Sequence, residues 1–117
     1  MKETDLFPPV KILLESLGFN VYAEARNCDV VGRKKEELVI VELKKNLNLT
    51  LLSQGMQRQK LTHQVFLCVP EPRKKNSSTR SKEELIKRLG LGLITVYTSP
   101  VRSAAKIIFE PSTENRI

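Results

Sequence analysis

The residues best suited to chemistry are an acid and a lysine, Glu42 and Lys44, which flank one leucine at the end of an apolar run. Alternate residues of a strand project from the same face of a sheet, so we expect these two side chains to lie side by side. A second acid, Asp29, belongs to the preceding predicted strand. Such apolar strands would bury these charges at least partly, and charged side chains are rarely buried without a partner. The three residues therefore form a candidate site.

A divalent cation is the compensation that this arrangement favours. Two carboxylates close together repel each other, and one of them keeps its proton at neutral pH unless a cation lies between them. Mg²⁺, or Mn²⁺ in its place, prefers carboxylate oxygens and leaves positions for water and phosphate oxygens. We expect Asp29 and Glu42 to bind it, while Lys44 orients or deprotonates the attacking water and offsets charge in the transition state. The alternative is an ordinary salt bridge between Lys44 and one of the acids.

The elements that must position these residues are predicted from the spacing of apolar side chains. A helix over residues 6–17 ends at Gly18, which supplies a left-handed stop. The run from Leu38 to Val41 is apolar on both faces, which is typical of a central strand covered by helices on each side. Three strands are predicted in this half of the chain, over residues 19–25, 28–33 and 37–43.

A second helix and a fourth strand follow. Thr50 is the expected cap of a helix that extends to about residue 61, with Leu52 and Met56 facing inward. The apolar residues 65–69 then predict a short buried strand. The chain thus reads as helix, three strands, helix and strand.

The last part of the chain contains a basic segment, a helix and two strands. Residues 71–82 are rich in Pro, Ser, Lys and Arg and predict an exposed loop. Ser81 and Glu84 have the spacing of a capping box before a third helix that stops at Gly90. The final strands are predicted over residues 93–97 and 105–109. The pattern predicts an α/β fold, with a mixed central sheet flanked by helices.

Length and charge restrict the interpretation further. A chain of 117 residues is enough for one domain, residues 1–117, and its 40% hydrophobic content is typical of a globular protein. A formal net charge of +7, from 20 basic and 13 acidic residues, attracts polyanions by releasing their condensed counterions. Nucleic acid, DNA or RNA, is the natural partner. The alternative is a soluble protein that is merely basic.

Neither a membrane partner nor a structural zinc site is indicated. No apolar stretch approaches the length of a membrane span, and the first residues lack the layout of a signal peptide, so we expect a cytoplasmic protein. Cys28 and Cys68 are isolated, without close-spaced ligand partners. We expect both to be reduced thiols rather than zinc ligands or a disulfide.

The arrangement of Asp29 on one strand and Glu42-Leu43-Lys44 on the next, followed by a helix and a strand, resembles the PD-(D/E)XK nuclease superfamily. More closely, nearly the whole chain is similar to a family of small predicted PD-(D/E)XK phosphodiesterases. One element departs from the motif, because Cys28 replaces the proline that precedes the acid. The segments that carry the resemblance are ETDLFPPVK, CDVV, VIVELKK, LLSQGMQRQKLT and RLGLGLITV.

The resemblance implies a restriction-endonuclease-like core and hydrolysis of DNA or RNA. It implies Mg²⁺ bound by Asp29 and Glu42, with the backbone carbonyl of Leu43 as a further ligand. Superfamily members often add an acid from the first helix, and Glu3 shares a predicted helical face with core residues. The alternative is that Glu3 is a frayed N-terminal residue in solvent. Glu24 is a second candidate for the extra acid.

Two further groups of residues are candidates for contact with substrate. The superfamily often has a glutamine that faces the active site on the helix after the E-x-K motif, which implies that Gln54, together with Arg58, contacts phosphate or orders the site. The basic loop would bind a phosphate backbone without reading sequence. No aromatic residue lies among its charges, so base stacking is not predicted there. The residues proposed for backbone contact are Arg58, Arg73, Lys74 and Lys75, with Arg80 and Lys82 nearby. For Gln54 and Arg58 the alternative is an ordinary solvated helix face. For the basic loop the alternative is a segment that only makes the protein soluble.

The leading expectation is a Mg²⁺-dependent nuclease that uses Asp29, Glu42, Lys44 and Gln54. A second hypothesis is a non-catalytic nucleic-acid-binding module, because a fold does not fix a function. A third is a subunit that works in a larger assembly or as a homodimer, because so small a domain has little surface for gripping a duplex.

Overall fold

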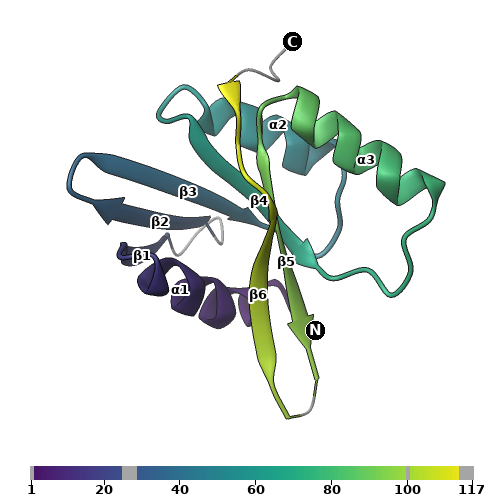
Figure 1. The fold of residues 1–117 in the computed structure, drawn as a ribbon, viewed down its shortest axis with the longest axis horizontal. Coiled ribbons are helices and arrows are strands. Elements are labelled where there is room, and N and C mark those ends of the chain that lie inside the picture. Colours follow the sequence, from purple (N-terminus) through teal and green to yellow (C-terminus); the bar gives the residue numbers. More distant parts are fainter. Residues whose placement is uncertain (1, 25–28, 100, 114–117) are drawn as a thin grey trace.

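The chain folds around a six-stranded mixed sheet whose strands lie in the order β1-β2-β3-β4-β5-β6 (Figure 1). The computed structural model describes residues 2–24, 29–99 and 101–113, with Glu24 and Asp29 described by their backbone only. β3, β4 and β5 are parallel to one another, whereas the other neighbours are antiparallel. The strands are β1 (Asn20–Glu24), β2 (Asp29–Lys34), β3 (Glu37–Leu43), β4 (Gln64–Pro70), β5 (Gly92–Thr98) and β6 (Ser103–Phe109).

Helices cover both faces of the sheet. A 3-10 turn, η1 (Glu3–Leu6), leads into α1 (Phe7–Ser16) on one face, while α2 (Leu49–Arg58) and α3 (Ser77–Arg88) lie on the other. The observed order of elements is helix, three strands, helix, strand, helix and two strands, as predicted. The predicted α/β class is therefore confirmed. None of the helices in the described ranges is long and apolar enough to cross a membrane.

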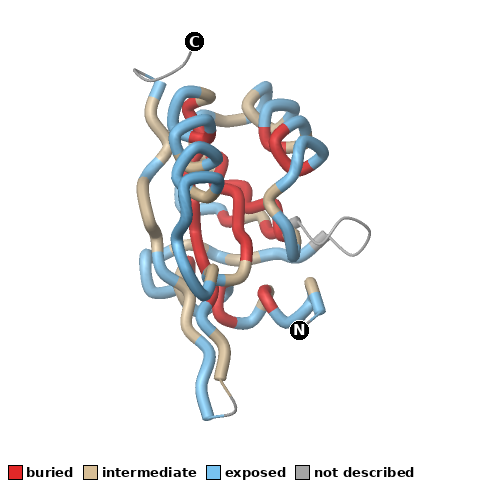
Figure 2. The backbone as a smooth tube through the Cα atoms, turned by 90° about the vertical axis from the view of Figure 1, so that its right-hand side faces the viewer, coloured by how far each residue is buried: buried red, intermediate tan, exposed pale blue. Residues whose placement is uncertain are grey.

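Two apolar cores lie on the two faces, and Figure 2 shows buried residues concentrated in the middle strands and on the inner sides of the helices. β3 contributes to both cores, as predicted for a central strand, because alternate residues point to opposite faces. The α1 core contains Leu6, Val10, Leu14, Val30, Val39, Val41, Leu43, Phe66, Cys68, Ile94 and Val96. The α2/α3 core contains Ile40, Leu51, Leu52, Val65, Leu67, Val69, Ile86, Leu91 and Leu93.

Two glycines fix the geometry of the first half of the chain. Gly18 has a φ of +94° directly after α1, a left-handed conformation that favours glycine and confirms the predicted stop. At Gly32 in β2, a Cβ atom would lie only 2.6 Å from Cγ1 of Val39 on β3. The β2–β3 hairpin therefore needs glycine at this position for its close packing.

The predicted start of α2 is wrong, and its predicted inward face is confirmed at Leu52, which is buried in the α2/α3 core, but wrong at Met56. The helix is capped by Asn48, whose side-chain oxygen accepts a hydrogen bond from the backbone N–H of Leu51 at 2.9 Å, and not by Thr50. Met56 is 46% exposed. A Cβ atom on Gly55 would lie 2.8 Å from Leu67, so the helix approaches the sheet most closely there. The side of α2 that contacts the sheet therefore contains Leu51 and Gly55, whereas Met56 faces solvent.

The predicted start of α3 is also wrong. The helix begins at Ser77, where Asn76 caps it by accepting a hydrogen bond from the N–H of Thr79 at 2.9 Å. Ser81 lies inside the helix, and the loop predicted over residues 71–82 ends before residue 77. The first turns of α3 carry no apolar side chain, so no hydrophobic periodicity marks them in the sequence. Only Ile86 of this helix is buried.

Candidate active site

The hairpin register places acidic residues in one row across three strands. Asp29 on β2 is the direct partner of Glu42 on β3, and Glu24 on β1 is the direct partner of Asp29. Residues directly opposite each other on antiparallel strands share a face of the sheet and are close neighbours. The backbone thus supplies the juxtaposition of Asp29 and Glu42 on which a shared cation depends.

Glu42 is the buried charge at the centre of this row. Its side chain is only 1% exposed, and it lies on the same face of the sheet as the α2/α3 core. The Nε–H of Arg58, at the end of α2, donates a hydrogen bond to Oε1 of Glu42 at 2.7 Å. A charge-assisted bond of this length is among the strong hydrogen bonds of proteins. Arg58 therefore compensates the carboxylate directly, a role that the sequence pattern had not indicated.

Lys44 follows the last residue of β3 and is held on both its backbone and its side chain. Its N–H donates to the carbonyl of Cys68 at 3.0 Å, which extends the parallel pairing of β3 with β4 by one residue. Its Nζ lies 3.9 Å from Oε2 of Glu3 in η1. The structure therefore brings Glu3, the predicted extra acid, to Lys44, and the side chain of Glu3 is 33% exposed rather than free in solvent.

α2 presents two predicted residues one turn apart. Gln54 and Arg58 are spaced so that they share a helical face, and Arg58 reaches Glu42. The side-chain oxygen of Gln54 is buried and has no hydrogen-bond partner among the described residues. Buried amide oxygens in native proteins almost always have a donor. Gln54 therefore offers an acceptor to a water, metal-bound water or substrate group at this face.

The residues present fit a hard divalent cation in their chemistry. Glu42 supplies a buried carboxylate, Leu43 is the last residue of β3, and the backbone of Asp29 pairs with that of Glu42. Within the described part of the chain, no group of three His, Cys, Asp or Glu side chains converges on one point. The side chains of Asp29 and Glu24 lie outside the described part.

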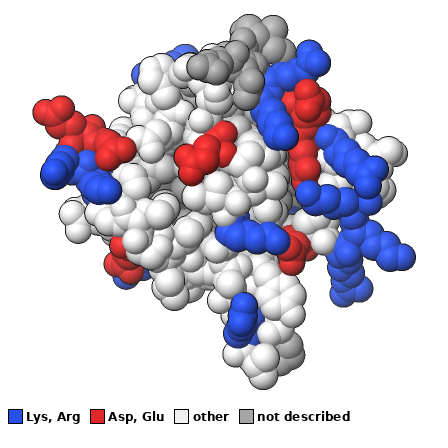
Figure 3. All heavy atoms as spheres, viewed as in Figure 1, with Lys and Arg blue, Asp and Glu red and all other residues white. Residues whose placement is uncertain are grey.

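The basic residues form a band over α3 and the loop before it, visible at the right of Figure 3. Arg73, Lys74 and Lys75 are exposed in that loop, as predicted. Nζ of Lys75 lies 3.2 Å from Oε2 of Glu83, which fastens the loop to α3. The predicted loop residues Arg80 and Lys82 belong to α3 itself and share its rigidity.

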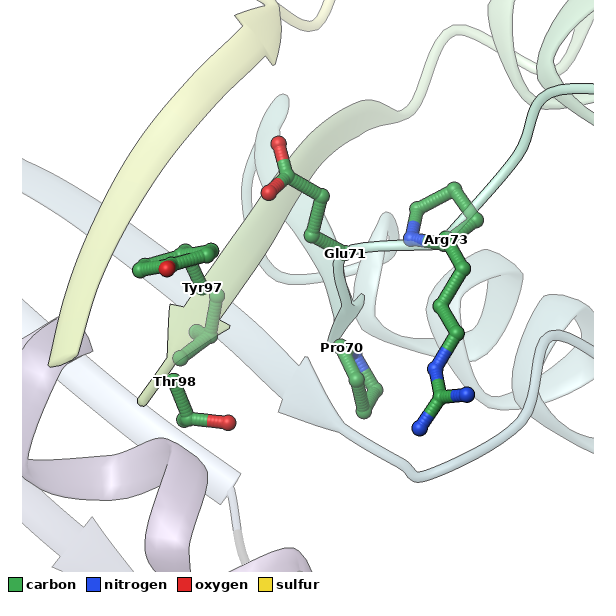
Figure 4. Close-up of a pocket in the computed structure, with 7 residues that line it drawn as sticks. Pro70, Glu71, Arg73, Tyr97 and Thr98 are labelled. Atoms are coloured by element: carbon green, nitrogen blue, oxygen red, sulfur yellow. The ribbon is translucent and has the colours of Figure 1, made fainter. Parts of the chain in front are cut away.

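Tyr97 is a candidate residue that the sequence pattern missed. It lies on β5 beside a cavity of about 570 Å³, and Arg73 lies on the other side of this cavity (Figure 4). The loop has no aromatic residue among its charges, and Tyr97 of β5 adds one to the lining of the cavity that Arg73 also lines. An aromatic residue at the end of a strand, exposed among buried neighbours, was the available signal.

Cys68 has no chemical role at this site. It is fully buried in the α1 core, and burial raises the pKa of its thiol far above the usual range. The thiol therefore stays protonated in the folded protein, and the prediction of a reduced thiol is confirmed for Cys68. Cys28 lies outside the described residues.

Fold and site together define an α/β protein with a row of acidic residues on a hairpin and a lysine directly after it. Comparison of the chain with protein-family models, with curated proteins and with solved structures finds no match.

Proposed function

We propose that this protein is a Mg²⁺-dependent nuclease with a restriction-endonuclease-like core, which hydrolyses phosphodiester bonds of DNA or RNA. The observation that carries the proposal is the direct pairing of Asp29 with Glu42 in the β2–β3 register. Glu42 is almost fully buried, and a protein that only bound phosphate would gain nothing from a buried acid beside the substrate. The excess of basic residues supports a polyanionic substrate.

Asp29, Glu42 and the carbonyl of Leu43 would hold the metal, with Glu3 as a further acid near Lys44. When bound, Mg²⁺ supplies Lewis-acid stabilisation of the phosphate and a more acidic water. Lys44 is fixed through its backbone at the end of β3, so its ammonium group is available to orient the attacking water and to offset developing charge. Gln54 accepts a hydrogen bond from the same water or from a substrate group.

The test is metal-dependent cleavage by the purified chain. Single- and double-stranded DNA and RNA are incubated with Mg²⁺, Mn²⁺ or EDTA, and products are resolved on denaturing gels. We expect cleavage with either metal and none with EDTA. Asp29→Asn and Lys44→Ala should each lower the rate by roughly 10²- to 10³-fold, as loss of one transition-state stabilising group does. Lys11→Ala, which removes an exposed charge from α1, is the matched control and should retain the rate.

A non-catalytic nucleic-acid-binding module is the second candidate, and the ion pair between Glu42 and Arg58 favours it. Arg58 compensates the buried acid without any metal, so the same scaffold is stable as a pure binder. That function predicts salt-sensitive binding with no turnover, unchanged by Asp29→Asn. Absence of cleavage of every substrate, together with such binding, would replace the nuclease proposal with this one.

A further inference from the structure

The parallel strands β3, β4 and β5 end on the same side of the sheet, and a cavity of about 570 Å³ lies at the carboxyl ends of β4 and β5. Figure 4 shows Tyr97 and Thr98 of β5 on one side of it, with Pro70 at the end of β4 and Arg73 of the following loop on the other. In α/β sheets with parallel strands, ligands bind outside the carboxyl ends of the strands. The cavity is within the size range of small-molecule sites.

The walls of this cavity have the chemistry that a nucleobase requires. Tyr97 is 49% exposed and offers the face of an aromatic ring, on which a base of any sequence can stack. Arg73 lines the same cavity and offers a planar group with several donors. Glu71 also lines the cavity, and Nζ of Lys106 lies 3.1 Å from its Oε1. This ion pair reduces the repulsion that the acid would exert on a phosphate.

A second cavity of about 300 Å³ adjoins the first. The two share the segment from Pro70 to Pro72 in their linings, and we call the two together the groove. Lys45, directly after the catalytic lysine, and Lys82 on α3 line the second cavity. Two ammonium groups facing one hollow are suited to the phosphates of a nucleic-acid backbone.

The groove leads away from the candidate active site. In the sheet register, Glu42 pairs with Leu67 and Leu67 with Leu93, which lies four residues before Tyr97. Strand spacings of about 4.8 Å across and 3.3 Å along the chain place Tyr97 roughly 16 Å from Glu42. At about 3.4 Å per stacked nucleotide, that distance is on the order of five nucleotides.

We propose that this groove binds a single strand of nucleic acid, with one unpaired base stacked on Tyr97 and backbone phosphates at Lys45 and Lys82. The inference rests on the proposed function and specifies its substrate as a strand that is unpaired several nucleotides from the cleaved bond. A paired base has no exposed face to offer to Tyr97, so duplex lacks this contact.

The test uses the fluorescence of Tyr97 in metal-free buffer, where binding is separated from cleavage. The chain has two tyrosines and no tryptophan, so Tyr22→Phe leaves Tyr97 as the only emitting residue. Single-stranded DNA and RNA ten-mers, a duplex ten-mer and mononucleotides are titrated with EDTA present. We expect single strands to quench Tyr97 emission at lower concentration than duplex or mononucleotides.

Affinities of variants provide the second readout. Tyr97→Ala should weaken binding of the single strand roughly ten-fold, as loss of one stacking ring does. Tyr97→Phe should keep the affinity, which excludes misfolding as the cause. Tyr22→Ala, which removes the other exposed tyrosine from β1, is the matched control and should change it less than two-fold.

Three results would each overturn the inference. The Tyr97→Ala and Tyr22→Ala variants could have equal affinity, or duplex could bind as tightly as the single strand. Mononucleotides could also quench as strongly as ten-mers, which would indicate a site for free nucleotides. Failure of the proposed function is recognised separately. Cleavage that persists while Tyr97 has no effect on binding refutes only the groove. Stacking on Tyr97 without cleavage under any metal condition refutes the nuclease and leaves the groove.

Discussion

The two faces of the sheet differ in the polar groups that they bury. The α1 core consists entirely of apolar side chains and the protonated Cys68, packed under one helix. The other face buries Glu42 and Thr95, and it carries the buried amide oxygen of Gln54. Burying polar groups costs free energy unless they are paired, so a face that keeps them is constrained by more than stability. The α1 core is purely apolar, whereas the α2/α3 face also keeps buried polar groups and, on the proposed function, carries part of the chemistry.

The largest effect on stability should come from the purely apolar face. Leu14 on α1 is 1% exposed in the α1 core, so Leu14→Ala removes buried atoms and leaves a cavity. We expect a loss of about 2–5 kcal/mol in the free energy of unfolding, measured by urea denaturation. Ile12→Ala on the same helix is the control, since Ile12 is 68% exposed and should cost less than about 0.5 kcal/mol. Similar losses for both variants would contradict the assignment of this face.

A comparable loss is expected on the other face for an electrostatic reason. Arg58→Met removes the cation that donates to Oε1 of Glu42, a carboxylate that is 1% exposed. Breaking such a pair costs about 3 kcal/mol, at the lower end of the usual range because the Arg58 side chain is 30% exposed. On the proposed function, Mg²⁺ should restore more thermal stability to this variant than to the wild type. A variant as stable as the wild type without metal would show that the pair contributes little.

Replacing the whole pair sharpens the contrast between the faces. Glu42→Leu combined with Arg58→Met turns this part of the α2 face into an apolar surface like the α1 core. Such replacements of buried ion pairs are often neutral or stabilising, so we expect the double variant to unfold within about 1 kcal/mol of the wild type. It should have no nuclease activity. A double variant less stable than Arg58→Met alone would mean that Glu42 also has a structural role of its own.

The apolar face and the order of elements were predictable because both follow from local periodicity. Residues 37–43 form a strand with the predicted bounds, and their pattern also indicated burial on both faces. Element boundaries were not predictable where the local signal is absent. The first turns of α3 are entirely polar, and Asn48 precedes Thr50, an equally plausible cap two residues later.

The sequence could predict how candidate residues are placed along one strand or hairpin, but not the contacts between separate elements. The hairpin brought Asp29 opposite Glu42. Lys44 lies one residue beyond β3 with its ammonium group near Glu3 of η1, so its placement beside Glu42 stays a prediction. The contact between Arg58 and Glu42 depends on how closely α2 approaches the sheet, which Gly55 decides through packing. The position of Tyr97 opposite Arg73 depends on the pairing of β4 with β5, which joins residues distant in the chain.

The smallest expected effects are changes of opposite sign in the free energy of unfolding, caused by the same substitution, threonine to valine, at two positions. Thr95, only 4% exposed on the α2/α3 face, has a hydroxyl without a hydrogen-bond partner among the described residues. Thr95→Val keeps the shape of the side chain and removes that hydroxyl, so it should stabilise the protein by about 1 kcal/mol. Thr62→Val should destabilise it by about 1 kcal/mol, because Oγ1 of Thr62 donates to the carbonyl of Leu38 at 2.7 Å.

Both substitutions are compared by chemical denaturation under the same conditions, so effects of the added methyl group on the unfolded chain largely cancel. Opposite signs would confirm that the α2/α3 face keeps an uncompensated polar group. A loss of stability at Thr95 equal to that at Thr62 would instead mean that a buried water satisfies the Thr95 hydroxyl. In that case the contrast with the α1 face rests on the buried amide oxygen of Gln54 and on the ion pair of Glu42 with Arg58.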